Sequence, residues 1–486
     1  MHNQLSKMMK IIKIFSLLLA SLVNYNIHIN ADNITTNKIL KQSHAIKNIS
    51  NELFIDKDIN NSLSLGYMSN QNILSKQIDF LDKIESFPSA LANYFMPKIT
   101  SKITNQRTLH SRPQIAGSDS SIRKTITFNQ PIFRGGAGYA SLKSAINEFH
   151  FSRFDYFTNE QNIIMKMIDT YLSTLLAKEK MRIAETSLTL SQTSYNAQFE
   201  RFKVGESTST DVATAQSNLA KAKANKASIK AEYTKAKSEF YKTFGIDDDN
   251  VTMPDIDKLV DQKDDIETFL YKVRNNNPQI IASKFAVKVR KNNANVARAS
   301  IMPRADFVIE VARNTPNQED ITLNQVKSDT VTSQISLEIP ILSAGGANHI
   351  NIRRSKGDIK RSMLNHIEIE KTIISQAKTN IEVLNSGKSR LKAAKKTLEA
   401  AKIAYDGMVQ EEKLGSKTIL DVLQSEENLV KAEESLVESK IFLLKTNYER
   451  LSLMGKMTAK EMNLNVSIFD PEKEFRKRKF KVIGFY

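Results

Sequence analysis

Few residues of this 486-residue chain have the types and spacing that chemistry requires. Cysteine is absent, which excludes disulfides, thiolate metal sites and a cysteine nucleophile. The seven histidines are scattered and none belongs to an H-E-x-x-H motif, so we expect no bound metal. No G-x-x-x-x-G-K-[ST] loop for phosphate occurs either, and we expect no cofactor.

Two aspartates remain, because Asp211 and Asp421 each follow a glycine (Gly205 and Gly415) by six residues. Glycine is a natural end for a helix, so each aspartate is expected in the first turn of the next helix. There a carboxylate interacts favourably with the helix dipole, by about 0.3–1 kcal/mol. This structural role is one interpretation of both residues, and a functional role can coexist with it.

The two aspartates belong to an internal repeat. Residues 201–212 align with 411–422 at an offset of 210 residues, and the same offset pairs Gly245 with Gly455. Upstream, Met96-Pro97 corresponds to Met302-Pro303. A Pro-Ile motif that ends in Gly-Gly recurs as well, and its landmark residues are Pro131, Gly135, Gly136, Pro340, Gly345 and Gly346. Four landmarks in one order indicate a duplicated unit.

Each unit predicts two long helices. The segments 138–204 and 347–414 lack proline and almost lack glycine, and each could form a helix of roughly 100 Å. A turn and a helix of about 35 residues follow, to Gly245 or Gly455. A shorter helix, 277–302, and the helix after the turn are together about as long as the long helix, so they could stack end to end beside it. Apolar residues repeat every seven positions in the last helix, as in a coiled coil: Leu423, Val430, Val437, Leu444 and Leu451.

Before each Gly-Gly lies a pair of strands, at about 98–133 and 304–342. Apolar and polar residues alternate there, as in 305–311 and 331–341, which is the period of a strand with one apolar face. We expect the polar links 108–120 and 314–329 to be exposed loops. No apolar run is long enough for a membrane helix after the N-terminus, so any membrane crossing requires a barrel with a polar lining. Four strands are too few to close one, which predicts an assembly of two or three copies.

The Gly-Gly pairs lie where strand gives way to helix, and we interpret them as permitting unusual backbone angles rather than as phosphate loops. The N-terminus, 1–31, has the basic front and short apolar core of a secretory signal peptide, with an amphipathic anchor as the alternative. Residues 32–65 are a poorly ordered lead-in, and the repeats span 66–255 and 256–469. The chain carries a net charge of +17 and ends in a basic tail, 470–486. We interpret that tail as a solvated end; anionic lipid or nucleic acid is the alternative ligand.

The ordered set of motifs resembles the TolC-type outer-membrane efflux and type I secretion proteins over about residues 70–480. Besides the landmarks above, it rests on Asn277-Pro278-Gln279-Ile280 and on Phe469-Asp470-Pro471. The resemblance implies a mainly helical homotrimer without catalytic activity. Four strands per chain would join a shared 12-stranded barrel in outer-membrane lipid of a Gram-negative bacterium, and the coiled-coil helices would form a periplasmic tunnel. The implied partners are a periplasmic adaptor (membrane fusion) protein and an inner-membrane ABC or RND-type pump.

The resemblance also implies which residues close and dock the tunnel. Thr210 and Asp211 match gate positions of the first repeat. Asp421 matches an inward aspartate of the second, where three copies would form an anionic ring that attracts cations. The family pattern is altered at Gln424, Glu412 and Lys417, which stand where an aspartate, a tyrosine and an arginine are usual; a Glu412–Lys417 link could replace the usual one. The turn tips that would dock the adaptor are Val204, Gly205, Glu206, Leu414, Gly415 and Ser416.

Two other classes of function compete with this one. A periplasmic coiled-coil adaptor would have a single helical hairpin and Gly- and Val-rich modules, which this chain lacks. A basic coiled-coil scaffold for nucleic acid is opposed by the signal peptide and by the alternating strands, so we expect no nucleic acid partner. The favoured function is an exit duct for efflux or type I secretion.

Overall fold

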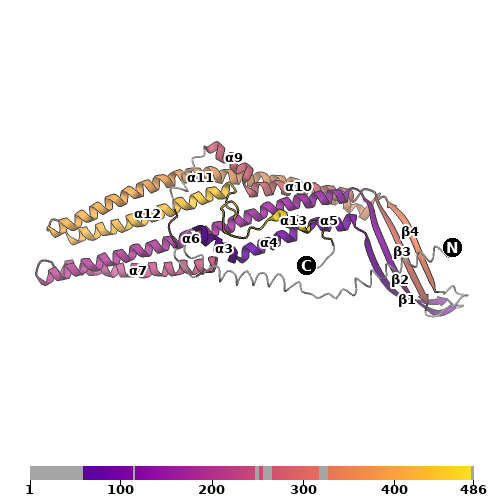
Figure 1. Cartoon of the computed structure of the whole chain (residues 1–486), viewed down its shortest axis with the longest axis horizontal. Coiled ribbons are helices and arrows are strands. Elements are labelled where there is room, and N and C mark those ends of the chain that lie inside the picture. Colours follow the sequence, from indigo (N-terminus) through magenta and orange to yellow (C-terminus); the bar gives the residue numbers. More distant parts are fainter. Residues whose placement is uncertain (1–58, 113–114, 247–250, 255–264, 317–326, 483–486) are drawn as a thin grey trace. The chain divides into compact units, whose positions relative to one another are not determined.

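The computed structural model describes residues 59–112, 115–246, 251–254, 265–316 and 327–482, all within the unit 55–482. The expected signal peptide and most of the expected lead-in lie outside the described residues. Within this unit, Figure 1 shows helices that run from a four-stranded sheet to two hairpin turns. No helix in the described part of the chain is both long and apolar enough to cross a membrane.

The elements occur in the same order in both halves of the chain. The first half contains α3 (Ile59–Ser69), α4 (Gln71–Ile84), α5 (Ser86–Phe95), β1 (Lys98–Arg112), β2 (Ile115–Arg134), α6 (Ala137–Lys203) and α7 (Ser209–Phe244). The second contains α9 (Ile266–Asn276), α10 (Pro278–Ala299), β3 (Arg304–Pro316), β4 (Ser328–Glu338), the 3-10 turn η1 (Ser343–Gly346), α11 (Ala347–Lys413) and α12 (Ile419–Leu453). The short helix α13 (Pro471–Arg478) follows. The predicted order of strand pair, long helix, turn and shorter helix is therefore present twice.

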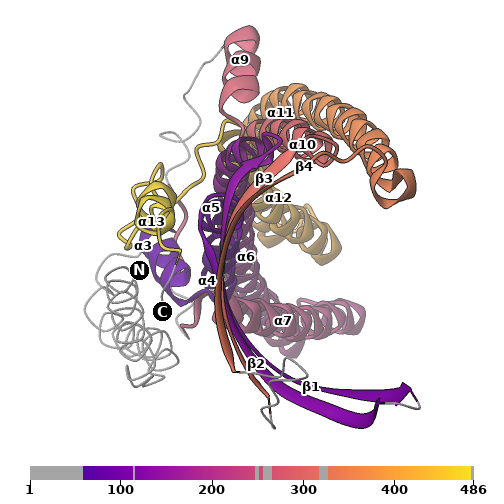
Figure 2. The ribbon, with the colours of Figure 1, turned by 90° about the vertical axis from the view of Figure 1, so that its right-hand side faces the viewer.

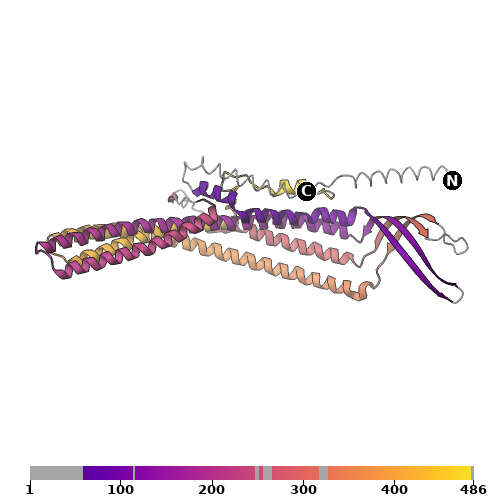
Figure 3. The same ribbon diagram turned by 90° about the horizontal axis from the view of Figure 1, so that it is seen from below.

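The shorter helices stack end to end, as their lengths predict. At the end of α12, the Asn277 side chain donates to the carbonyl of Leu453 (3.1 Å) while it also caps the first turn of α10. The first repeat has an equivalent joint, where Ser69 Oγ donates to the carbonyl of Phe244 at the end of α7 (3.1 Å). Each joint supplies partners for backbone groups that a helix end leaves unsatisfied. Figure 3 shows α10 and α12 alongside the long helices.

The four strands form one antiparallel sheet in the order β1-β2-β3-β4, so the two repeats meet at the β2–β3 pair. The expectation of an exposed loop over 108–120 is wrong, because β1 and β2 stay paired as far as Arg112 and Ile115. Polar residues favour loops, but an antiparallel ladder satisfies their backbone groups equally well. In the second pair, most of the expected loop lies outside the described residues, and β4 ends at Glu338, before the alternation of residue types ends.

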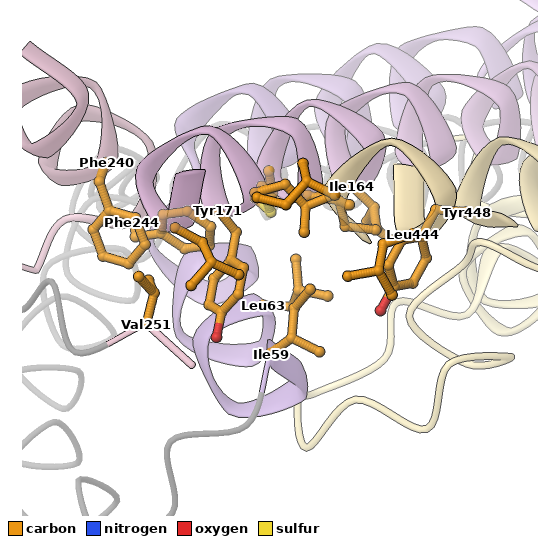
Figure 4. Close-up of a cluster of buried hydrophobic side chains, with 14 of the residues drawn as sticks. Ile59, Leu63, Ile164, Tyr171, Phe240, Phe244, Val251, Leu444 and Tyr448 are labelled. Atoms are coloured by element: carbon orange, nitrogen blue, oxygen red, sulfur yellow. The ribbon is translucent and has the colours of Figure 1, made fainter. Parts of the chain in front are cut away.

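The main hydrophobic core lies where α3 and the segment after α12 cover the middle of α6. Leu63, Ile164 and Tyr171 are fully buried there, together with Leu444 of α12 (Figure 4). The expected lead-in is therefore wrong for residues 59–65, which are helical. Burying Leu63 against α6 stabilises a helix that has no clear periodicity of its own.

The basic tail also departs from the expectation of a solvated end. Phe475 of α13 stacks on Phe149 of α6, with 4.2 Å between the ring centroids, and Arg478 pairs with Glu85 (3.1 Å). The aromatic rings hold the helix against α4 and α6 while Arg476 and Lys477 stay exposed. Charge composition alone did not indicate this packing.

Candidate functional site

The hairpin turns lie at the ends of α6 and α11. Gly205 and Gly415 have φ of 85° and 76°, a left-handed conformation that glycine adopts without strain. In each turn the next amide donates back to a helix carbonyl: Glu206 to Arg201 (2.9 Å) and Ser416 to Glu411 (2.9 Å). The preceding apolar side chains are left outside, because Val204 is 71% and Leu414 84% exposed. Exposed apolar residues at a turn tip are suited to contact with another protein.

Asp211 and Asp421 lie in the first turns of α7 and α12, as expected, and each forms a capping box with the threonine three residues earlier. Asp421 accepts from the Thr418 amide (3.0 Å) and hydroxyl (2.8 Å), and Thr418 in turn accepts from the Asp421 amide (3.3 Å). The Thr208–Asp211 pair repeats this arrangement at the start of α7. The hydrogen bonds from Thr418 lower the pKa of Asp421, with a smaller effect from Lys417. The Asp421 carboxylate is therefore negative at neutral pH, and the residue is partly exposed.

A polar contact joins the two hairpins close to their tips. Arg201 Nη1 and Gln198 Nε2 of α6 donate to Glu412 Oε1 of α11, at 2.5 and 2.8 Å. Gln198 is buried and also accepts from the Ser207 hydroxyl (3.0 Å), so its amide group is held in place. The Glu412 side chain is only 14% exposed, against 32% for Arg201. This contact lies within one chain.

The expected Glu412–Lys417 link is not formed. Among the described residues Glu412 pairs with Arg201 instead, across the interface between the hairpins. Lys417, Gln424 and Thr210 are exposed side chains near the turns. Lys417 lies in the turn just after Gly415, whereas Arg201 approaches Glu412 from the neighbouring hairpin.

A second buried contact between the hairpins, farther from the tips, was not expected from the sequence. Glu426 of α12 is 4% exposed, and it accepts from the hydroxyl of Ser191 (2.9 Å), with Ser187 at 3.5 Å. The Asn218 amide of α7 donates to the Ser191 hydroxyl (3.2 Å), so three helices share the cluster. Burial raises the pKa of Glu426, and the serine bonds offset this only in part. A glutamate on the apolar stripe, four residues after Val422, is the signal that could have revealed it.

The sheet has two different exposed faces. One is apolar and includes Ile103, Ile126, Ile335 and Leu337, which are between 44% and 73% exposed. The other holds cross-strand ion pairs, Arg123 with Glu310 (3.0 Å) and Arg134 with Asp306 (2.6 Å). An antiparallel sheet with an apolar face and a polar, charged face is suited to separate lipid from water.

The strand-to-helix transitions contain the Gly-Gly pairs. Gly135 and Gly136 have φ of 60° and 82°, and Gly345 and Gly346 have 56° and 88°, all left-handed. A Cβ at Gly135 would lie 2.5 Å from Met302 Cβ, so this position also needs a close approach of two segments. Pro131 lies at the bulge of β2, and Pro340 just follows β4. These residues have structural roles, and no group of three or more metal-binding side chains occurs in the part of the chain that the structure describes.

Comparison with known proteins places these features in a family. BepC of Brucella suis, an outer membrane efflux protein, is 24% identical over 77% of this chain and 83% of its own length. AprF of Pseudomonas aeruginosa, an alkaline protease secretion protein, is 19% identical over 75% of this chain and 76% of its own.

Among solved structures, the Campylobacter jejuni CmeC outer membrane channel superposes with a TM-score of 0.71 at 14% identity, covering 87% of this chain and 89% of CmeC. The fold therefore matches that of these channels. The family model described as outer membrane efflux protein matches residues 91–245 and 269–451. Those residues make up well over half of this chain, which therefore belongs to the outer membrane efflux protein family.

Proposed function

We propose that this protein is an exit duct through the outer membrane of a Gram-negative bacterium, for efflux or type I secretion, and that it performs no catalysis. The observation that supports this most strongly is the two-faced sheet joined through the Gly-Gly segments to two helices of 67 residues each. The apolar face would contact lipid and the charged face would line a wet lumen. The helices would continue that lumen into the periplasm for about 100 Å.

The duct would be a homotrimer. In one chain, the outer edges of β1 and β4 have no partner among the described strands, and such edges favour pairing with another chain. Three copies would supply twelve strands and close one barrel. Figure 2 views the sheet and the helices from the sheet end, where they follow one curve. Closure by edge pairing makes the membrane domain inseparable from the oligomer.

The hairpin tips would form the periplasmic gate and the docking site for a partner. Glu412 ties the second hairpin to Arg201 and Gln198 of the first, so opening requires this contact to break. Three copies of Asp421 would form an anionic ring that attracts cations. The exposed residues Val204, Glu206, Leu414 and Ser416 would contact a periplasmic adaptor, which would connect the duct to an ABC or RND-type pump in the inner membrane.

One set of measurements tests the proposal. The mature protein should be recovered with the outer membrane, migrate as a heat-modifiable trimer and conduct ions in a planar lipid bilayer. Its N-terminal sequence should begin near residue 32, because residues 1–31 would be removed as a signal peptide. Recovery as a soluble periplasmic protein that leaves bilayers silent would contradict the duct and favour a periplasmic adaptor.

A further inference from the structure

On the apolar face of the sheet, charged residues first occur in one row of side chains. Ile103, Lys124, Arg313 and Asp329 are paired in register across β1, β2, β3 and β4. The neighbouring row toward the helices is Ser101, Ile126, Val311 and Val331, which is almost entirely apolar. Charge therefore begins abruptly on this face.

On β3 and β4 the charged row lies near the end that is remote from the helices, whereas the β1–β2 ladder continues beyond the row to Arg112 and Ile115. β2 leads into α6 through Arg134 and β3 starts after α10, so Arg304 and Glu338 mark the near end. Asp329 is eight residues before Leu337, the last exposed apolar residue of β4, which spans about 26 Å along the strand. An apolar band about 25 Å tall is typical of an outer-membrane barrel. In the proposed duct, the row would therefore stand where the hydrocarbon ends on the outer side.

The charges on this row are unbalanced. Arg313 makes two parallel bonds to Asp329, of 2.7 and 2.8 Å, so this pair is neutral. Lys124 is exposed and forms no ion pair among the described residues. Lys327, which directly precedes β4, is also exposed and interacts electrostatically with Asp329. We call Lys124, Lys327, Arg313 and Asp329 the distal cluster, and its net charge is 3 − 1 = +2.

We propose that the distal cluster binds the phosphate groups of a phosphorylated glycolipid in the outer leaflet of the outer membrane. The proposal rests on the proposed function, because it requires the apolar face to contact lipid. Lysine side chains at the edge of an apolar band extend toward the headgroups, and ammonium groups at that level attract anionic headgroups. The Arg313–Asp329 pair would hold the two strands in register between the lysines, and the assembled duct would have three such sites.

The experiment measures lipid binding to the full-length protein purified in a neutral detergent. Diphosphoryl lipid A is the probe, with phosphatidylcholine as the zwitterionic comparison of zero net charge, and bound lipid is counted by native mass spectrometry. The test variant is Lys124→Gln combined with Lys327→Gln. Its matched control is Lys102→Gln, because Lys102 is an exposed lysine of β1 opposite Thr125, on the other face of the sheet.

We expect lipid A to bind about fivefold more weakly for each lysine removed, and about 25-fold more weakly in the double variant. The Lys102→Gln control and phosphatidylcholine binding should not change. Equal loss in the control, or unchanged binding in the double variant, would overturn the proposal. Displacement of lipid A by inorganic phosphate alone would overturn it too, because the site would then recognise a free anion.

Failure of this proposal can be told apart from failure of the proposed function. Bilayer conductance is measured on the same samples. If the protein conducts ions and the double variant binds lipid A as strongly as the unmodified protein, the glycolipid site is refuted and the duct is not. A silent protein would refute the duct.

Discussion

Removing the carboxylate of Glu412 should loosen the contact between the two hairpins. In Glu412→Ala, Arg201 and Gln198 lose their shared acceptor. Arg201 is 32% exposed in its side chain and can turn to solvent, but the Gln198 amide is buried and keeps only the Ser207 contact. The arrangement with joined hairpins therefore loses an ion pair and leaves a buried donor without a partner.

The magnitude follows from these two bonds. A hydrogen bond to a charged group contributes about 1.5–3 kcal/mol, and partial exposure of Arg201 places its bond at the lower end. With a smaller contribution from Gln198, the loss is about 2 kcal/mol per chain. Since 1.4 kcal/mol is a factor of ten, the ratio of open to closed hairpins should rise about 30-fold.

Single-channel recording in planar bilayers measures this ratio as the occupancy of the high-conductance state. Glu411→Ala is the matched control, because Glu411 has the same charge one residue earlier but is exposed. A double-mutant cycle with Arg201→Ala should show a coupling energy, since residues in direct contact are not additive. Unchanged open occupancy in Glu412→Ala, or an equal rise in Glu411→Ala, would refute this role of Glu412.

Three further predictions concern other residues. Asp421→Ala should weaken the block of bilayer conductance by multivalent cations, and unchanged block would remove Asp421 from the ring. Burial raises the pKa of Glu426 above its ordinary value of 4.5, so the protein should lose stability as the pH rises from 4.5 through the raised pKa. Glu426→Gln should abolish this dependence of the melting temperature on pH, and a dependence that persists in the variant would contradict the prediction. Gly455→Ala should lower the melting temperature, because the Cβ would lie 2.5 Å from the Asn276 carbonyl oxygen at a φ of 75°. Gly357→Ala, in open space within α11, should instead stabilise by about 0.5–1 kcal/mol; equal effects would refute the strain argument.

The comparison of sequence and structure shows where local pattern was sufficient. Both 67-residue helices begin and end within a residue of the predicted bounds, because Gly-Gly and the Gly205 and Gly415 turns are local signals. The places of Asp211 and Asp421 in the first turns of their helices were predictable for the same reason, while their capping boxes were not predicted. Local pattern misled at 108–120, where polar residues continue a strand ladder, and at 59–65, where burial stabilises a helix.

The amino-acid sequence by itself determined the duplication, the lengths of the helices, the two faces of the strands and the positions of the turns. Those features depend on periodicity and on glycine, which act over a few residues. Only the tertiary structure decided that Glu412 meets Arg201, 211 residues away, and that Glu426 meets Ser191, 235 residues away. Such contacts depend on the stagger and rotation of one hairpin against the other, which are set by packing over the whole length of the helices.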